Sequence, residues 1–119
     1  MTRLSPDGSG APRSATAEVL LTGDLYIVSY PQALERVEEA ERGGPALLVI
    51  DLSALEFVDS TGVRLVLDAD QRARAQGRRV AVRLGAGPAK RVFHTLGLLD
   101  VLDVLPEASG GDPAGGAAP

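Results

Sequence analysis

The chain has 119 residues, of which 45% are hydrophobic, and its Gly- and Pro-rich ends leave room for a single domain with one modest core. It has no Cys and one His, which excludes disulfides and thiolate metal sites and gives no metal or cofactor signature. A formal net charge of −4 argues against nucleic acid as a partner and favours another protein.

The two ends of the chain differ in composition from the middle. Residues 1–14 are rich in Ser, Pro, Gly and charge, and residues 106–119 are mainly Gly, Ala and Pro, so both are predicted to be disordered around a domain at 15–105. The first residues lack the apolar stretch of a secretion signal, and no apolar run approaches the length of a membrane span. We therefore expect a cytoplasmic protein without membrane insertion.

The first elements are a strand and a helix. Residues 17–22 predict a strand that ends in a turn at Gly23-Asp24. A helix is predicted to start at Ser29, which would act as N-cap with Gln32 completing a capping box. Its buried stripe is expected to comprise Ala33, Leu34, Val37 and Ala40.

The central stretch joins a buried strand to a second helix. Leu47 to Ile50 form a short apolar run typical of a strand buried on both faces. Helical spacing then begins near Gly62 and stops at Gln76-Gly77. Ser60 is therefore expected where a loop leads into a helix N-terminus.

A helix N-terminus gives Ser60 two possible roles. The first turn has backbone N–H groups without intrahelical partners and carries the positive end of the helix dipole. Either Asp59 or Ser60 can cap these N–H groups, or they can receive a phosphate carried by Ser60. The residues alone leave both alternatives open.

The remaining elements complete an alternating pattern. Residues 78–84 predict a strand near a sheet edge, residues 88–96 a short helix with Val92, Phe93 and Leu96 inward, and residues 101–105 a last short strand. Strands that alternate with helices predict an α/β fold with parallel neighbouring strands. The order of the strands does not follow from this pattern.

Several motifs together resemble the STAS domains of bacterial anti-sigma factor antagonists. They are Asp51-Leu52-Ser53, Phe57-Val58-Asp59-Ser60-Thr61-Gly62, Gly77 and Thr95-Leu96-Gly97-Leu98, and the resemblance covers roughly residues 18–105. It implies a single STAS-like domain with a small mixed sheet of four or five strands and helices mainly on one side. It further implies a protein that is not an enzyme. The unphosphorylated form would bind an anti-sigma factor with serine-kinase activity and release a sigma factor, and a serine phosphatase would act on phospho-Ser60.

The resemblance also implies a site. Ser60 would be the phosphorylated residue, and the expected partner surface comprises Asp24, Asp59, Ser60, Thr61, Gly62 and Arg64. Related domains carry a second acid where this chain has Tyr26. Arg64, Asp68 and Arg72 follow at i, i+4 spacing, and we expect Arg64 to contact the partner while Asp68 and Arg72 form solvated pairs.

Other functions are weighed against this hypothesis. The main rival is a STAS scaffold that is never phosphorylated, such as an accessory subunit of a membrane transporter complex. A serine hydrolase would need Gly where Val58 stands and would have only His94 as base. The loop at 85–88 lacks the Gly-Lys-Ser/Thr end of a phosphate-binding loop. No catalytic or metal-binding residue is therefore predicted.

Overall fold

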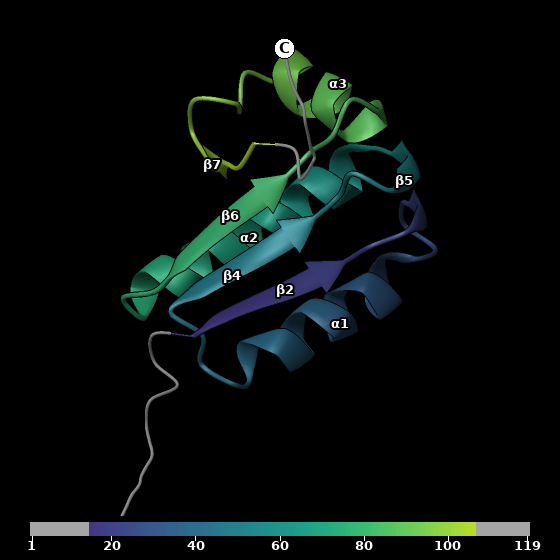
Figure 1. The fold of residues 1–119 in the computed structure, drawn as a ribbon. Coiled ribbons are helices and arrows are strands. Elements are labelled where there is room, and N and C mark those ends of the chain that lie inside the picture. Colours follow the sequence, from purple (N-terminus) through teal and green to yellow (C-terminus); the bar gives the residue numbers. More distant parts are fainter. Residues whose placement is uncertain (1–14, 107–119) are drawn as a thin grey trace, which may run out of the picture.

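The computed structural model describes residues 15–106, so the ends predicted to be disordered lie outside it except for residue 106 (Figure 1). The helices are α1 (Tyr30–Glu41), α2 (Ser60–Ala75) and α3 (Pro88–Thr95). The strands are β2 (Thr16–Leu20), β3 (Gly23–Leu25), β4 (Leu47–Asp51), β5 (Leu55–Val58), β6 (Arg79–Arg83) and β7 (Asp103–Val104). The predicted alternation of strands and helices in an α/β fold is confirmed.

Within residues 15–106 the main sheet has four strands, in the order β2-β4-β6-β7. Its pairings among residues 15–106 are all parallel, where a mixed sheet was expected. The parallel order follows from the helices that connect β2 to β4 and β4 to β6, because each crossover returns the chain to the same end of the sheet. β6 lies close to an edge as predicted, since in the described part of the chain only the two-residue β7 lies outside it.

A second, two-stranded parallel sheet joins β3 to β5. The predicted turn at Gly23-Asp24 was wrong, because these residues belong to β3, and β5 was not predicted. Gly and Asp are poor strand formers, and Gly23 has a φ of 80°. The pairing follows instead from the main sheet. β2 and β4 are parallel neighbours, and the chain continues from β2 into β3 and from β4 into β5, so β3 and β5 are brought side by side. Asp24 lies opposite Phe57 in its register.

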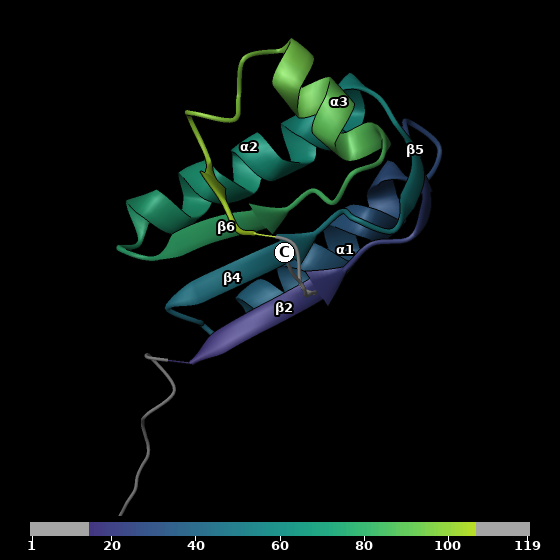
Figure 2. The ribbon, with the colours of Figure 1, turned by 45° about the horizontal axis from the view of Figure 1, so that its top comes forward.

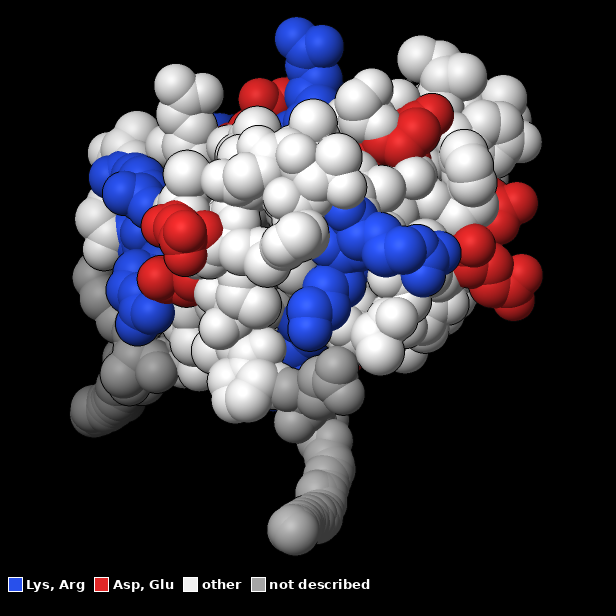
Figure 3. Space-filling model, turned by 90° about the horizontal axis from the view of Figure 1, so that it is seen from above, with Lys and Arg blue, Asp and Glu red and all other residues white. Residues whose placement is uncertain are grey.

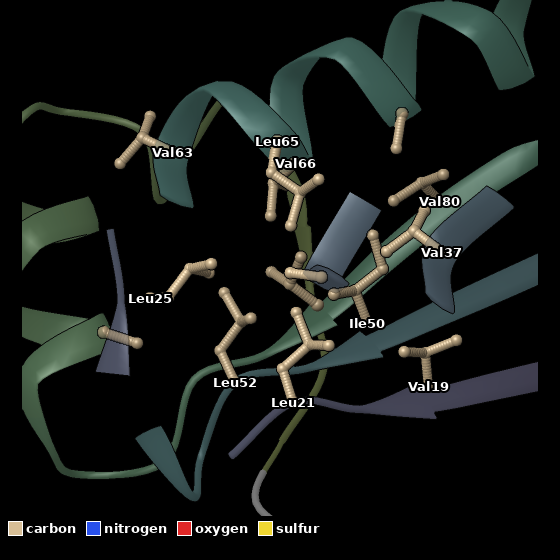
Figure 4. Packing of buried hydrophobic residues seen from close by; sticks show 14 of the residues in the cluster. Val19, Leu21, Leu25, Val37, Ile50, Leu52, Val63, Leu65, Val66 and Val80 are labelled. Carbon is tan, nitrogen blue, oxygen red and sulfur yellow. The ribbon is translucent and has the colours of Figure 1, made fainter. Parts of the chain in front are cut away.

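Helices α1 and α2 cover the same face of the main sheet, and Figure 2 shows no described helix over the other face. The core fills the space between these helices and the sheet (Figure 4). Val37 of α1, Ile50 of β4 and Val66 of α2 are each fully buried there. Helices mainly on one side of the sheet are therefore confirmed.

The predicted capping box at α1 was wrong. Ser29 has helical dihedrals, with φ −91° and ψ −5°, and its side chain makes no cap hydrogen bond. Its hydroxyl donates instead to the Asp24 carbonyl at 2.6 Å and accepts from the Tyr26 N–H at 3.1 Å. A capping side chain needs an extended backbone to reach the next turn, so Ser29 ties the preceding turn to β3 instead.

Candidate functional site

The N-terminus of α2 is built on Asp59. This residue is extended, with φ −122° and ψ −164°, and its side chain accepts a hydrogen bond from the Thr61 N–H at 2.9 Å. Asp59 is therefore the N-cap, and the alternative of Ser60 as cap is excluded. Ser60 is the first residue of α2 and its side chain is exposed.

The small sheet sets the position of this helix end. The Asp59 N–H donates to the Leu25 carbonyl at 3.4 Å, which ties the start of α2 to the end of β3. Gly62, one turn further on, is buried. A Cβ at this position would clash with Val58 and would lie 2.9 Å from Leu25 Cδ2. The absence of a side chain at Gly62 therefore lets α2 lie directly against β3 and β5.

The structure brings most of the predicted site residues together. Asp59, Ser60 and Thr61 form the start of α2, and Arg64 is exposed one turn later. Asp24 is exposed on β3, the strand paired with the one that leads into Asp59. Gly62 points inward, which disagrees with a direct partner contact, so we assign it the role of positioning the helix.

One predicted solvated pair has a different partner. Arg72 pairs with Glu41 of α1, with 3.0 Å between Nη2 and Oε2, and not with Asp68. Asp68 and Arg72 lie on adjacent turns of α2. Because α1 packs against α2, the Glu41 carboxylate of α1 lies within reach of Arg72 and takes the place of Asp68 as its partner. This ion pair is structural and lies at the opposite end of α2 from Ser60.

A groove missed by the sequence analysis lies between Ser60 and α3. It has a volume of about 360 Å³ and a mainly apolar lining, and the residues around it are Asp59, Ser60, Arg91, Val92, Thr95 and Leu96. Leu96 was expected to point inward but is 52% exposed, because Phe93 and Ala89 alone fill the buried side of α3. Val92 and Leu96 are four residues apart and therefore lie on one side of the helix, next to the side buried by Ala89 and Phe93. This spacing in the sequence could have predicted a second apolar face on α3.

Apolar side chains that are exposed or half-buried gather on β5 and on the turn that follows β3, close to the start of α2. Tyr26 and Phe57 contact edge to face, with ring centroids 6.3 Å apart and an interplanar angle of 82°. Ile27 and Val28 continue the chain after Tyr26 and are 73% and 71% exposed. We call Tyr26, Ile27, Val28 and Phe57 the apolar patch. Seen from above, the end of the molecule that carries α3 and β5 shows a broad uncharged area bordered by charged residues (Figure 3).

Contiguous apolar surface of this kind is typical of protein-binding sites. Within residues 15–106 no group of His, Cys, Asp or Glu side chains is arranged to hold a metal ion. In the same part of the chain, none of the helices combines the length and the apolar character needed to cross a bilayer. It is the apolar surface near Ser60 that suits the docking of another protein.

Comparison with known proteins gives the family. A family model described as the STAS domain matches residues 14–109. The chain belongs to the STAS domain family. Its fold class, predicted from the sequence, agrees with that of solved STAS structures.

Two named proteins are similar to this STAS domain. The anti-sigma-F factor antagonist RsfB of Mycobacterium tuberculosis is 28% identical over 88 residues, which are 74% of this chain and 71% of that protein, in two strains. The anti-sigma factor antagonist SpoIIAA in its unphosphorylated form superimposes with a TM-score of 0.63 at 24% identity, over 79% of this chain and 83% of that one. The phosphorylated form of SpoIIAA, a Bacillus cell fate determinant, gives a TM-score of 0.58 at 24% identity, over 83% and 89% of the two chains.

Proposed function

We propose that this STAS domain is a cytoplasmic anti-sigma factor antagonist controlled by phosphorylation of Ser60. In its unphosphorylated form it binds an anti-sigma factor with serine-kinase activity and so releases a sigma factor. Transfer of a phosphate from ATP to Ser60 Oγ by that kinase ends the binding, and a serine phosphatase restores it. The observation that carries the proposal is an exposed Ser60, not used as a cap, that lines an apolar groove and follows the patch residue Phe57 by three positions.

The names of the similar proteins support this proposal. RsfB is named as an antagonist of an anti-sigma factor. SpoIIAA is also described as such an antagonist, and its structures include an unphosphorylated and a phosphorylated form. A serine in the exposed position found here gives this chain a residue on which the same kind of control can act.

The control follows from electrostatics at the site. Phosphorylation adds about −1.5 to −2 charges beside the Asp59 carboxylate. A partner surface that covers the apolar groove has to remove this charge from water, and an acidic partner group nearby would also repel it. A penalty of about 3 kcal/mol weakens binding more than a hundredfold, so the switch needs no refolding of the domain.

The test compares three proteins in binding to the candidate kinase by calorimetry. Ser60→Ala should bind as tightly as the unmodified protein, because the hydroxyl is neutral. Ser60→Asp should bind roughly a hundredfold more weakly. Incubation of the unmodified protein with kinase and ATP should add one phosphate, seen by intact mass, and Ser60→Ala should gain none. Equal affinity of the Ala and Asp variants would refute the switch.

A second function, a STAS scaffold that is never phosphorylated, is favoured by one observation. Tyr26 stands where the resemblance leads one to expect a second acid, and it packs against Phe57 as part of the apolar patch. In a transporter accessory subunit or a similar assembly this patch would be a permanent interface. Stable binding of a partner with no phosphate on Ser60 after incubation with kinase and ATP would support the scaffold.

A further inference from the structure

The groove places a cation of α3 opposite Ser60. Arg91 and Thr95 are separated by one helical turn, and both line the groove whose other wall contains Ser60. Arg91 is exposed and forms no ion pair within residues 15–106. The guanidinium is therefore available to an anion that appears in the groove.

The backbone N–H groups at the N-terminus of α2 are less available to a phosphate than the sequence indicated. The Thr61 N–H is already bonded to the Asp59 side chain at 2.9 Å, and the Gly62 N–H donates to the Asp59 carbonyl at 3.0 Å. The Asp59 carboxylate occupies the position that an anion would take and repels a second negative group. A phosphate on Ser60 therefore needs a partner from outside the first turn of α2.

We propose that the phosphate on Ser60 is held across the groove by the Arg91 guanidinium, with the Thr95 hydroxyl as a second donor. An Arg side chain can engage two phosphate oxygens at once, and charge-assisted hydrogen bonds of this type are roughly twice as strong as neutral ones. The phosphate would then lie between α2 and α3 and close the apolar groove. This inference rests on the proposed function and adds that the inactive form has a covered docking surface as well as an added charge.

Arg64 is the competing cation. It lies four residues after Ser60 on α2 and is exposed, so its side chain lies on the same helix face. It does not line the groove, whereas Arg91 does. The charged groups that face the phosphate are therefore Asp59 and Arg64 from α2 and Arg91 from α3, and the proposal assigns the main contact to Arg91.

The test uses the full chain with phosphoserine inserted at position 60 during translation, so that no kinase is required. The second pKa of the phosphate is measured by ³¹P NMR. A nearby cation favours the dianion and lowers this pKa, so Arg91→Gln should raise it by about 0.5 unit. Lys90→Gln is the matched control, because it removes the same charge from the neighbouring position of α3, and Lys90 lines a different pocket, with Leu84 and Gly85. Lys90→Gln should change the pKa by less than about 0.2 unit, and Arg64→Gln should change it less than Arg91→Gln does.

Thermal unfolding gives the second readout. Arg91→Gln should lower the Tm of the phosphorylated protein by about 3 °C and leave the unphosphorylated protein within about 1 °C of its parent. An equal loss in both forms would mean a structural role for Arg91 and would overturn the proposal. A larger pKa change for Arg64→Gln than for Arg91→Gln would also overturn it.

The two proposals fail separately. If Arg91→Gln changes neither the pKa nor the Tm while Ser60→Asp still loses the kinase, the switch stands and the Arg91 contact is wrong. If the phosphate responds to Arg91 but no kinase modifies Ser60, the contact is real and the proposed function is wrong.

Discussion

At the scale of single residues, Gly62 decides how closely α2 approaches the small sheet. It lies inside the first turns of a helix, where Ala would ordinarily be favoured by about 1 kcal/mol over Gly. The space for a Cβ is taken by Val58 and Leu25, so the usual preference is reversed here. The exposed position of Ser60, two residues earlier, depends on this close approach.

Gly62→Ala is therefore expected to lower the free energy of unfolding by about 1–3 kcal/mol, because the added methyl group overpacks the contact with β3 and β5. Urea unfolding measures the effect. Gly43→Ala is the control, because a Cβ there would meet only the Ala40 carbonyl at 3.9 Å, and it should stay within about 0.5 kcal/mol. A Gly62→Ala protein as stable as its parent would show that α2 can shift away from the sheet without loss.

At the scale of elements, the small sheet of β3 and β5 positions the N-terminus of α2 and the apolar residues near it, whereas the main sheet forms the core. The four-residue strand β5 leads directly into the α2 cap and contributes Phe57 to the apolar patch, and the turn after β3 contributes Tyr26, Ile27 and Val28. Phe57 is 49% exposed although it is aromatic and lies three residues before Ser60. Half-exposed aromatic residues near the centre of an apolar surface are typical binding hot spots.

Phe57→Ala should therefore weaken binding of the partner by about tenfold or more. Leu20→Ala is a matched control, because Leu20 is 45% exposed but lies on the strand β2 of the main sheet, away from the patch. The affinities are measured by calorimetry, with the Tm of each variant as a check on folding. Equal losses for the two variants would remove Phe57 from the docking surface.

At the scale of the whole molecule, the two faces of the main sheet are protected in different ways. Helices cover one face, whereas charged side chains cross the other. Glu18, Val49 and Ala81 lie side by side in the register on this second face, and Val49 and Ala81 are nevertheless buried. Arg83 reaches across β4 to Glu18 on β2, with 3.3 Å between Nε and Oε2. The aliphatic part of this Arg therefore helps to cover the apolar centre of the face.

Arg83→Ala is expected to lower the free energy of unfolding by about 1 kcal/mol through loss of this cover. Glu18→Gln, which removes only the charge of a half-exposed pair, should cost less than about 0.5 kcal/mol. Urea unfolding of both variants makes the comparison. Equal losses would mean that the ion pair, and not the covering of Val49, is the stabilising part.

The sequence by itself determined what depends on neighbours along the chain. The apolar run at residues 47–50 predicted a buried strand, and the helical spacing after Gly62 predicted a helix with Ser60 at its start. The surrounding motifs indicated the STAS family. Only the tertiary structure decided what depends on residues far apart in sequence. It paired β3 with β5, gave Arg72 a partner 31 positions away in Glu41, and placed Arg91 across a groove from Ser60. Periodicity reports which side of an element is apolar, whereas contacts between elements are set by how the sheet and helices pack, and no local pattern encodes that packing.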